Sequence, residues 1–205
     1  MMIDELSAPA LVTWQLTRDC DLACLHCCTD SAPGRALPNE LTKCESIALA
    51  QQLVREGVPY VMLAGGEPTL VPHFLEVADY LGQGGVQLKI ETNGQAFTSE
   101  LAGRLAAVSP RSLQVSLDGD TQTVYGRQRP GGSLEKAWTA CRLAVLTGLP
   151  LEVTFAPTRV NVHEAEAVID RAAALGAFRF NTGLLMRLGT AAKLWDRLAL
   201  SKEQT

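Results

Sequence analysis

Short apolar segments alternate with helical patterns along this chain at a regular spacing. The second, third and fourth segments begin at residues 60, 86 and 112, and the fifth and sixth begin at 151 and 178, so the period is close to 26 residues. That is the length of one strand-plus-helix unit. Repeated β–α units joined by short loops predict a parallel sheet with right-handed crossovers. A flat doubly wound sheet and a curved, partial (β/α) barrel both agree with this pattern.

The expected strands are rich in Val, Leu, Ile and Phe, which is typical of buried strands. They span residues 10–17, 60–65, 86–92, 112–118, 151–157 and 178–183. Helical patterns that end in Gly lie at 41–57, 73–82, 133–148 and 163–176. A helix after the sixth strand is expected to begin within 188–205. No linker or low-complexity stretch interrupts the chain, so we expect a single domain over 1–205.

The clearest helical pattern is 41–57. Thr42 and Glu45 form a T-x-x-E capping box at its start, and Gly57 follows its end. Its apolar face is expected to carry Ile47, Ala48, Leu53 and Val54.

Composition excludes several classes of protein. The net charge of −4 provides no basic field for nucleic acid or an anionic membrane, and no apolar run reaches the roughly 18 residues of a membrane span. The N-terminus places acids before its apolar residues and lacks the basic region of a secretory signal. We therefore expect a cytoplasmic protein without nucleic-acid or membrane partners. In that reducing compartment, clustered cysteines more often bind metal or do redox chemistry than form disulfides.

Polar or Gly-containing stretches follow five of the six expected strands directly. They are the cysteine-rich segment after the first strand, then Gly65–Pro68, Thr92–Gly94, Ser116–Gly119 and Asn181–Gly183. Each alone is a common connector. The carboxyl ends of parallel strands lie at one edge of a sheet or barrel, however, and ligands bind there. The sequence therefore predicts a site formed by several strand ends.

Four of the six cysteines lie within nine positions, in the segment TRDCDLACLHCCTD. Cys20, Cys24 and Cys27 have the spacing C-x3-C-x2-C. A structural zinc site usually needs two separated pairs of ligands, and a redox pair of Cys24 and Cys27 would leave Cys20 without a role. Three thiolates on one loop suit a [4Fe–4S] cube with one open iron. Cys28 is interpreted as a spare, and His26 as a loop residue that packs against the cluster.

The other two cysteines, Cys44 and Cys141, lie on expected helices. A small buried residue fits both positions, so we expect both thiols to pack in the core.

The order of these motifs resembles the radical S-adenosylmethionine (SAM) superfamily. The resemblance covers nearly the whole chain and is based on CDLACLHC, GGEP, ETNG and SLDG on successive strands. It implies a partial (β/α)6, TIM-like barrel with a parallel sheet. It also implies an enzyme of the oxidoreductase or maturase type, in which a cluster reductively cleaves SAM to a 5′-deoxyadenosyl radical that abstracts hydrogen from a substrate.

The resemblance also assigns roles to residues. Cys20, Cys24 and Cys27 would ligate the cluster, and Val153 to Phe155 would form the wall behind the adenine. Glu67 would accept from the SAM ammonium group. The further SAM contacts would be Gly65, Gly66, Pro68, Thr92, Asn93, Ser116 and Asp118, with Arg127 or Arg129 on the SAM carboxylate.

Within the superfamily, the start WQLTRDCDLACLHC and the segment RPGGSLEKA resemble the branch that modifies peptides or tetrapyrrole precursors. That branch includes the coenzyme PQQ, mycofactocin and haem d1 or alternative haem maturases, and implies an electron donor such as flavodoxin or ferredoxin. Its members usually continue into a cysteine-rich SPASM or twitch extension, whereas no cysteine follows Cys141 here. The alternatives are therefore a truncated, non-catalytic cluster-binding relative that binds a partner, and a phosphate-binding α/β protein without iron.

Overall fold

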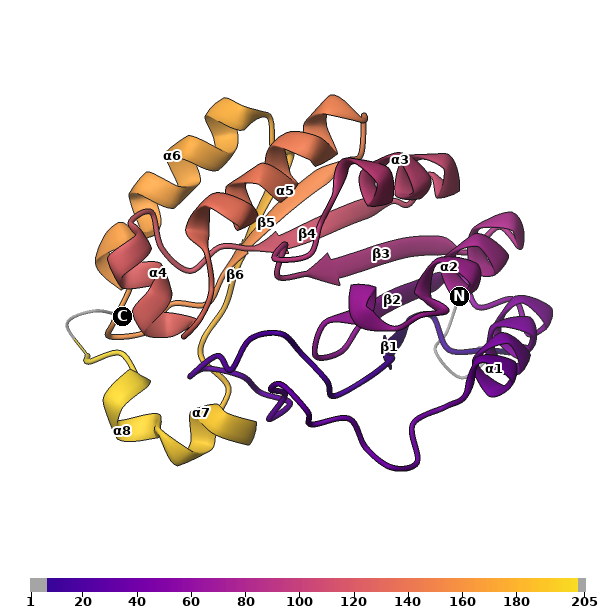
Figure 1. Ribbon diagram of the computed structural model, residues 1–205, viewed down its shortest axis with the longest axis horizontal. Helices are drawn as coiled ribbons and strands as arrows, with labels where there is room; N and C mark the ends of the chain where they lie inside the picture. The colour runs from indigo at the N-terminus through magenta and orange to yellow at the C-terminus, as the bar shows by residue number, and fades with distance from the viewer. Residues whose placement is uncertain (1–6, 203–205) are drawn as a thin grey trace.

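A six-stranded parallel sheet organises the computed structural model, which describes residues 7–202 (Figure 1). The strands follow one another across the sheet in the order β1-β2-β3-β4-β5-β6. Their bounds are β1 Val12–Gln15, β2 Tyr60–Ala64, β3 Gln87–Thr92, β4 Ser112–Ser116, β5 Leu151–Phe155 and β6 Arg179–Thr182. The predicted strands and their parallel pairing are confirmed. The sequential order is that of a partial barrel, since a doubly wound sheet reverses its strand order.

Helices cover one side of this sheet, and Figure 1 shows α1, α2, α3, α5 and α6 following one another along it. Their bounds are α1 Lys43–Arg55, α2 Phe74–Gln83, α3 Ser99–Val108, α4 Gln122–Gln128, α5 Leu134–Leu146 and α6 Ala165–Leu175. Two short 3₁₀ helices are η2 Pro68–Leu70 and η3 Val162–Glu164. The loop after β1 and the short helices α7 Gly189–Lys193 and α8 Trp195–Leu198 lie on the other side.

The predicted capping box of α1 is confirmed. The Thr42 hydroxyl accepts from the N–H of Glu45, and the Glu45 carboxylate accepts from the N–H of Thr42. Two predictions on this helix are wrong. Ala48 and Cys44 are exposed, because the buried stripe runs through Ser46, Ala50 and Leu53 instead.

Two elements were not predicted, and a third differs from its prediction. Helices α3 and α4 follow β3 and β4, although Thr98 and Thr121 cap them with side-chain oxygens in the usual way. The expected final helix is two short helices, α7 and α8, separated at Leu194. Cys141 is buried on α5, as predicted.

The two faces of the sheet differ in character. On β3, Leu88 and Ile90 are buried in the core under the helices, whereas Lys89 and Glu91 alternate with them and face the other way. The side chains of β3 are thus apolar on the helix side and polar on the inner face, where Glu91 borders a cavity. Strands β4 and β5 are buried along almost their whole length, as expected.

Hydrogen bonds and an ion pair join the polar side chains of this inner face. The Lys89 ammonium contacts the Glu152 carboxylate at 2.8 Å, and the Gln114 amide donates to Glu91 at 2.8 Å. The Asn181 amide donates to both Gln114 and Glu152, at 2.9 and 2.6 Å. Strands β3 to β6 are therefore linked by side chains as well as by their backbones.

None of the helices within residues 7–202 is both long enough and apolar enough to span a lipid bilayer.

Candidate cluster and cofactor site

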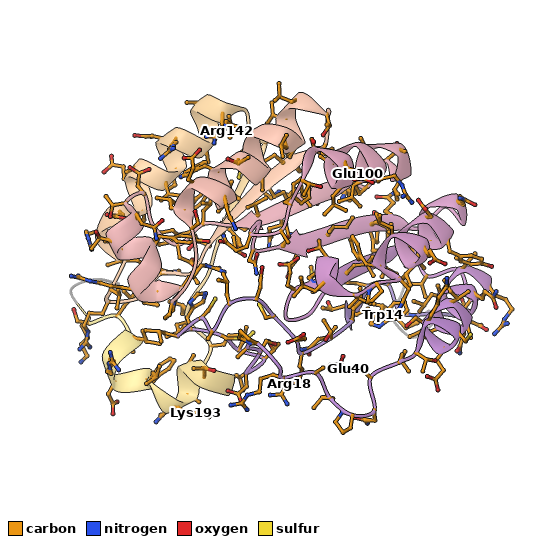
Figure 2. All side chains as sticks on the ribbon, viewed as in Figure 1. Trp14, Arg18, Glu40, Glu100, Arg142 and Lys193 are labelled. Carbon is orange, nitrogen blue, oxygen red and sulfur yellow. The ribbon has the colours of Figure 1, made fainter. Side chains whose placement is uncertain are left out.

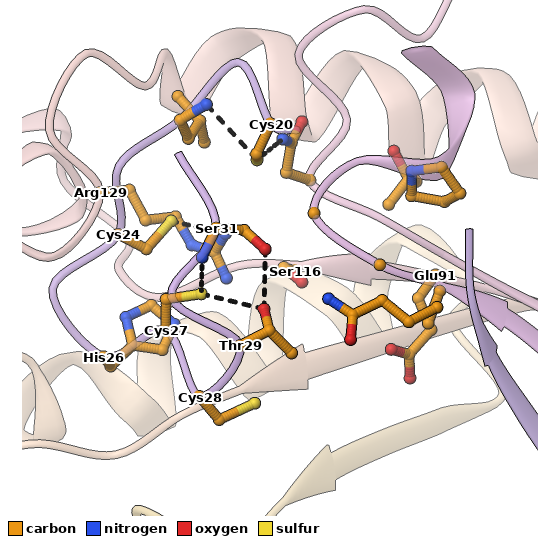
Figure 3. Close-up of a pocket in the computed structure, with 18 of the residues that line it drawn as sticks. Cys20, Cys24, His26, Cys27, Cys28, Thr29, Ser31, Glu91, Ser116 and Arg129 are labelled. Carbon is orange, nitrogen blue, oxygen red and sulfur yellow. Dashed lines mark hydrogen bonds between the residues drawn. The ribbon is translucent and has the colours of Figure 1, made fainter. Parts of the chain in front are cut away.

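A cavity of about 320 Å³ lies at the carboxyl edge of the sheet, beside the loop that follows β1 (Figure 3). It brings together most of the site residues expected from the sequence. Those that line it are Cys20, Cys24, Cys27, Gly65, Gly66, Pro68, Thr92, Asn93 and Ser116. Residues from the ends of β2, β3 and β4 thus meet the cysteine loop in one pocket.

Each of the three cysteine sulfurs accepts a hydrogen bond from a nitrogen donor. Cys20 Sγ accepts from the backbone N–H of Leu22 at 3.4 Å, and Cys27 Sγ from that of Ser31 at 3.3 Å. Cys24 Sγ accepts from the guanidinium of Arg129 at 3.5 Å. Such donors stabilise a thiolate and tune a metal bound to it.

Burial opposes ionisation of two of these thiols, Cys20 and Cys24, in the absence of a metal. It raises the pKa of Cys20 to about 12, against the hydrogen bond from Leu22. It also raises the pKa of Cys24, although the Arg129 cation lowers it in part. Binding of a metal to these sulfurs must therefore release protons.

Glu67 is fully buried and joins the loop after β2 to the end of β3. Its carboxylate accepts from the Thr69 hydroxyl at 2.7 Å, the Thr92 hydroxyl at 2.9 Å and the Asn93 N–H at 2.8 Å. Burial raises its pKa against these hydrogen bonds. Glu67 does not line the cavity. Its hydrogen bonds instead position the loop after β2 against the end of β3.

Gly65 and Gly66 pass very close to the backbone that leads into the cysteine loop. A Cβ atom on Gly66 would lie 2.0 Å from the Asp19 carbonyl oxygen, and one on Gly65 would lie 2.7 Å from that of Thr17. The N–H groups of Gly66 and Glu67 donate to these same two carbonyls, at 2.7 and 2.9 Å. Only glycine permits this approach.

Asp118 is buried behind the cavity, where its carboxylate pairs with an arginine and a histidine. Its carboxylate contacts Arg129 Nε at 2.6 Å and His26 Nε2 at 3.1 Å, and accepts from the Ala156 N–H at 2.7 Å. Burial alone would raise the pKa of Asp118, but Arg129 and His26 together hold it well below its usual range.

The structure places the two arginines expected from the sequence differently. Arg127 is exposed on α4 and does not line the cavity, whereas Arg129, two residues later, does. The turn of α4 directs the two side chains differently, and the buried Asp118 holds Arg129 inward.

Val153–Phe155, expected to form the wall behind the adenine, do not line this cavity. Val153 and Phe155 are buried in the core, and Phe155 borders a second, apolar hollow of about 390 Å³ beside α6. Sequence reasoning assigned no role to Gln15 or Glu91, which do line the cavity. Their alternation with buried apolar neighbours was the available signal.

The C-terminal segment holds the cysteine loop from outside (Figure 2, where Arg18, Glu40 and Lys193 are labelled along this side). The N–H of Thr190 donates to the Cys27 carbonyl at 2.9 Å, and the Lys193 ammonium contacts Asp30 at 2.8 Å. At the near end of the loop, the Glu40 carboxylate accepts from the N–H of Arg18 at 2.7 Å. The loop is thus anchored at both ends.

Comparison with known proteins gives the family. Residues 14–181 match the Radical SAM superfamily. The chain belongs to this superfamily.

Two curated relatives are similar in sequence. The mycofactocin maturase MftC of Mycobacterium tuberculosis is 38% identical over 173 residues, which cover 84% of this chain and 44% of the relative. An AdoMet-dependent heme synthase of Methanosarcina barkeri is 29% identical over 192 residues, covering 92% of this chain and 54% of that protein. The chain thus spans about half the length of the curated radical SAM relatives it matches.

A solved structure has the same fold. SuiB of Streptococcus suis bound to S-adenosylmethionine superposes with a TM-score of 0.78 at 18% identity, over 88% of this chain and 41% of SuiB. At this identity the likeness concerns the fold alone.

The residues present fit an iron–sulfur cluster. The donor set is three thiol groups on one loop, all on one cavity and each with a nitrogen donor directed at its sulfur. Soft thiolates are the ligands that such clusters require. Within residues 7–202, no three Cys, His, Asp or Glu side chains are grouped as a site for a single metal ion.

Proposed function

We propose that this chain is the radical-generating part of a maturase that acts on a precursor peptide or a tetrapyrrole-type precursor of a cofactor. One observation carries the proposal: Cys20, Cys24 and Cys27 line the same cavity as Gly65, Gly66 and Asn93. The substrate class is supported by the curated relatives, whose names refer to mycofactocin maturation and to heme synthesis.

The cluster and SAM would occupy adjacent parts of this cavity. Cys20, Cys24 and Cys27 would hold the cluster, and the Gly65–Pro68 loop would hold the amino group of SAM through its backbone. Thr92, Asn93 and Ser116 would line the ribose and carboxylate region. Arg129 replaces Arg127 as the candidate for the SAM carboxylate, because its guanidinium reaches the cavity. Glu67 and Asp118 would act from behind, by positioning the Gly65–Pro68 loop and Arg129.

Held by Cys20, Cys24 and Cys27, the cluster would supply the electron for reductive cleavage of SAM, and a ferredoxin or flavodoxin would resupply it. The protein's own residues would orient the cluster and SAM and enclose them. Glycines 65 and 66 let the backbone approach closely, and the anchored cysteine loop keeps the thiolates at one end of the cavity.

The inner face of the sheet offers groups for a substrate. Glu91 and Gln15 line the cavity, and Glu91 is joined through Gln114 to Asn181 on β6. These acceptors and donors suit amide, hydroxyl or cationic groups, which occur in peptides, and carboxylate-bearing precursors would meet Lys89 at the same face.

The test is cleavage of SAM without substrate, because the three cysteines and the cavity that they line would carry this step. The chain is reconstituted anaerobically with iron and sulfide and reduced with dithionite in the presence of SAM. We expect bound iron and 5′-deoxyadenosine, both lost in Cys24→Ala. Cys44→Ala is the matched control, since Cys44 is an exposed cysteine on α1 away from the cavity. Bound iron with intact SAM would favour the non-catalytic relative instead.

A further inference from the structure

Arg129 connects a buried carboxylate to one of the three cysteine sulfurs. Its Nε lies 2.6 Å from Asp118 Oδ2, and its Nη1 lies 3.5 Å from Cys24 Sγ. The side chain is buried, with 6% of the residue exposed, and it borders the cavity (Figure 3). The guanidinium is therefore placed between Asp118 and the cysteine loop.

The orientation of this guanidinium is fixed from behind. Asp118 accepts from the Ala156 N–H through its other carboxylate oxygen, at 2.7 Å, and its backbone carbonyl accepts from the Asn161 amide at 3.1 Å. Because Asp118 cannot turn, the planar fork of Arg129 presents Nη1 to Cys24 without losing further side-chain freedom.

The three sulfurs differ in the charge of their donors. Cys20 and Cys27 accept from neutral groups. The donors to Cys20 are the N–H of Leu22 and the Asn93 amide, and the donor to Cys27 is the N–H of Ser31. Among the hydrogen bonds within residues 7–202, Cys24 is the cysteine of this loop whose sulfur accepts from a cation. An arginine side chain stays protonated in proteins, so this donor is charged.

We infer that Arg129 is a positioning residue that directs a cationic N–H donor at Cys24 and so raises the reduction potential of the cluster that Cys24 would ligate, with Asp118 orienting the guanidinium. The inference depends on the proposed function in one respect, that Cys24 ligates the cluster. Reduction adds one negative charge to the cluster. A cation and an N–H···S hydrogen bond stabilise the reduced form more than the oxidised form, because hydrogen bonds to sulfur and local charge set the potential of such clusters.

The test measures the midpoint potential of the reconstituted cluster without SAM, so that SAM binding does not enter. Redox titrations followed by electron paramagnetic resonance compare the wild type with Arg129→Met and with Arg127→Met. At a fixed potential we expect Arg129→Met to lower the ratio of reduced to oxidised cluster about tenfold, equivalent to about 59 mV for one electron. Arg127→Met is the matched control, since it removes an exposed arginine two positions away, and it should leave the ratio unchanged.

Removal of Arg129 alone leaves the Asp118 carboxylate buried beside His26, and that variant can fail to fold. The double variant Asp118→Asn/Arg129→Met avoids the unpaired carboxylate. It is compared with Asp118→Asn, so that the two proteins differ only in Arg129, and the same tenfold fall is expected between them. Equal potentials within each folded pair, at equal iron content, would overturn the inference. Equal iron binding by the wild type and by Cys24→Ala would show that Cys24 is not a ligand, and would overturn the inference on that ground. The iron content thus distinguishes a wrong ligand from a wrong effect of Arg129 on the potential.

Discussion

The carboxylate of Glu67 accepts the backbone N–H of Asn93 at 2.8 Å, so the loop after β2 is hydrogen-bonded to the residue that follows β3. Glu67 is fully buried, and its other oxygen accepts from the hydroxyls of Thr69 and Thr92. Two neighbouring strand ends are thereby fixed relative to each other, with the cavity beside both.

Replacement of this carboxylate by an amide, in Glu67→Gln, should loosen the two loops. The amide nitrogen of Gln would face either the Asn93 N–H or the Thr69 N–H, which donates to the other oxygen at 3.3 Å. In both orientations a donor faces a donor and leaves a buried group unsatisfied, at about 1–3 kcal/mol. We expect the free energy of unfolding to fall by that amount and the Kd for SAM to rise, with iron binding retained. Urea denaturation and equilibrium dialysis measure these. Glu100→Gln, at an exposed position of α3, should change stability by less than about 0.5 kcal/mol; an equally small effect in Glu67→Gln would refute the role.

Gly189 should tolerate no side chain. Its φ is +54°, and a Cβ there would lie 2.6 Å from the Cys27 carbonyl oxygen, which accepts from the N–H of Thr190. Gly189→Ala should displace α7 and speed loss of the cluster to a chelator several-fold, followed by visible absorbance. Gly183→Ala in the same segment is the control, since open space surrounds its Cβ position. Equal rates of cluster loss in the two variants would contradict this prediction.

The pH dependence of stability should reflect Glu91. Burial raises its pKa, so the folded state holds this proton at a pH where the unfolded chain, with a pKa of about 4.3, has released it. The stabilising effect of the proton is complete below that value and is lost as pH rises toward the folded pKa. Glu91→Gln should therefore remove this pH-dependent loss. The free energy of unfolding of the metal-free variant, measured relative to the wild type, should be more favourable at pH 7 than at pH 4. Urea titrations across this range measure it, and a difference from the wild type that does not change with pH would contradict the assignment.

The adjacent cysteines 27 and 28 should behave differently. The sulfur of Cys27 accepts from the Ser31 N–H at 3.3 Å, whereas Cys28 is exposed. Cys27→Ser should abolish cluster assembly, and Cys28→Ser should retain it, judged by iron and sulfide content per chain. Loss of iron in both variants would show that Cys28 takes part in ligation.

Much of this architecture follows from local signals. The strand positions follow from apolar runs at a fixed period, and the capping box of α1 from Thr42 and Glu45, because these patterns depend on neighbouring residues. The choice of Arg129 over Arg127 does not. It depends on where α4 ends and on Asp118, which the sequence placed near the site without its partners. The contact between Thr190 and Cys27 joins distant parts of the chain, and no local pattern encodes it.

The division of the strands into an apolar and a polar face bears on how such proteins diverge. Leu88 and Ile90 on β3 hold the helices, whereas Lys89 and Glu91 between them belong to the inner face. A closed TIM barrel fills its interior with packed branched side chains, so changes there disturb folding. In this partial barrel an inward residue can be exchanged while the helix-covered layer stays intact. Recognition can then evolve one inward side chain at a time, on a scaffold and a cysteine loop that need not change.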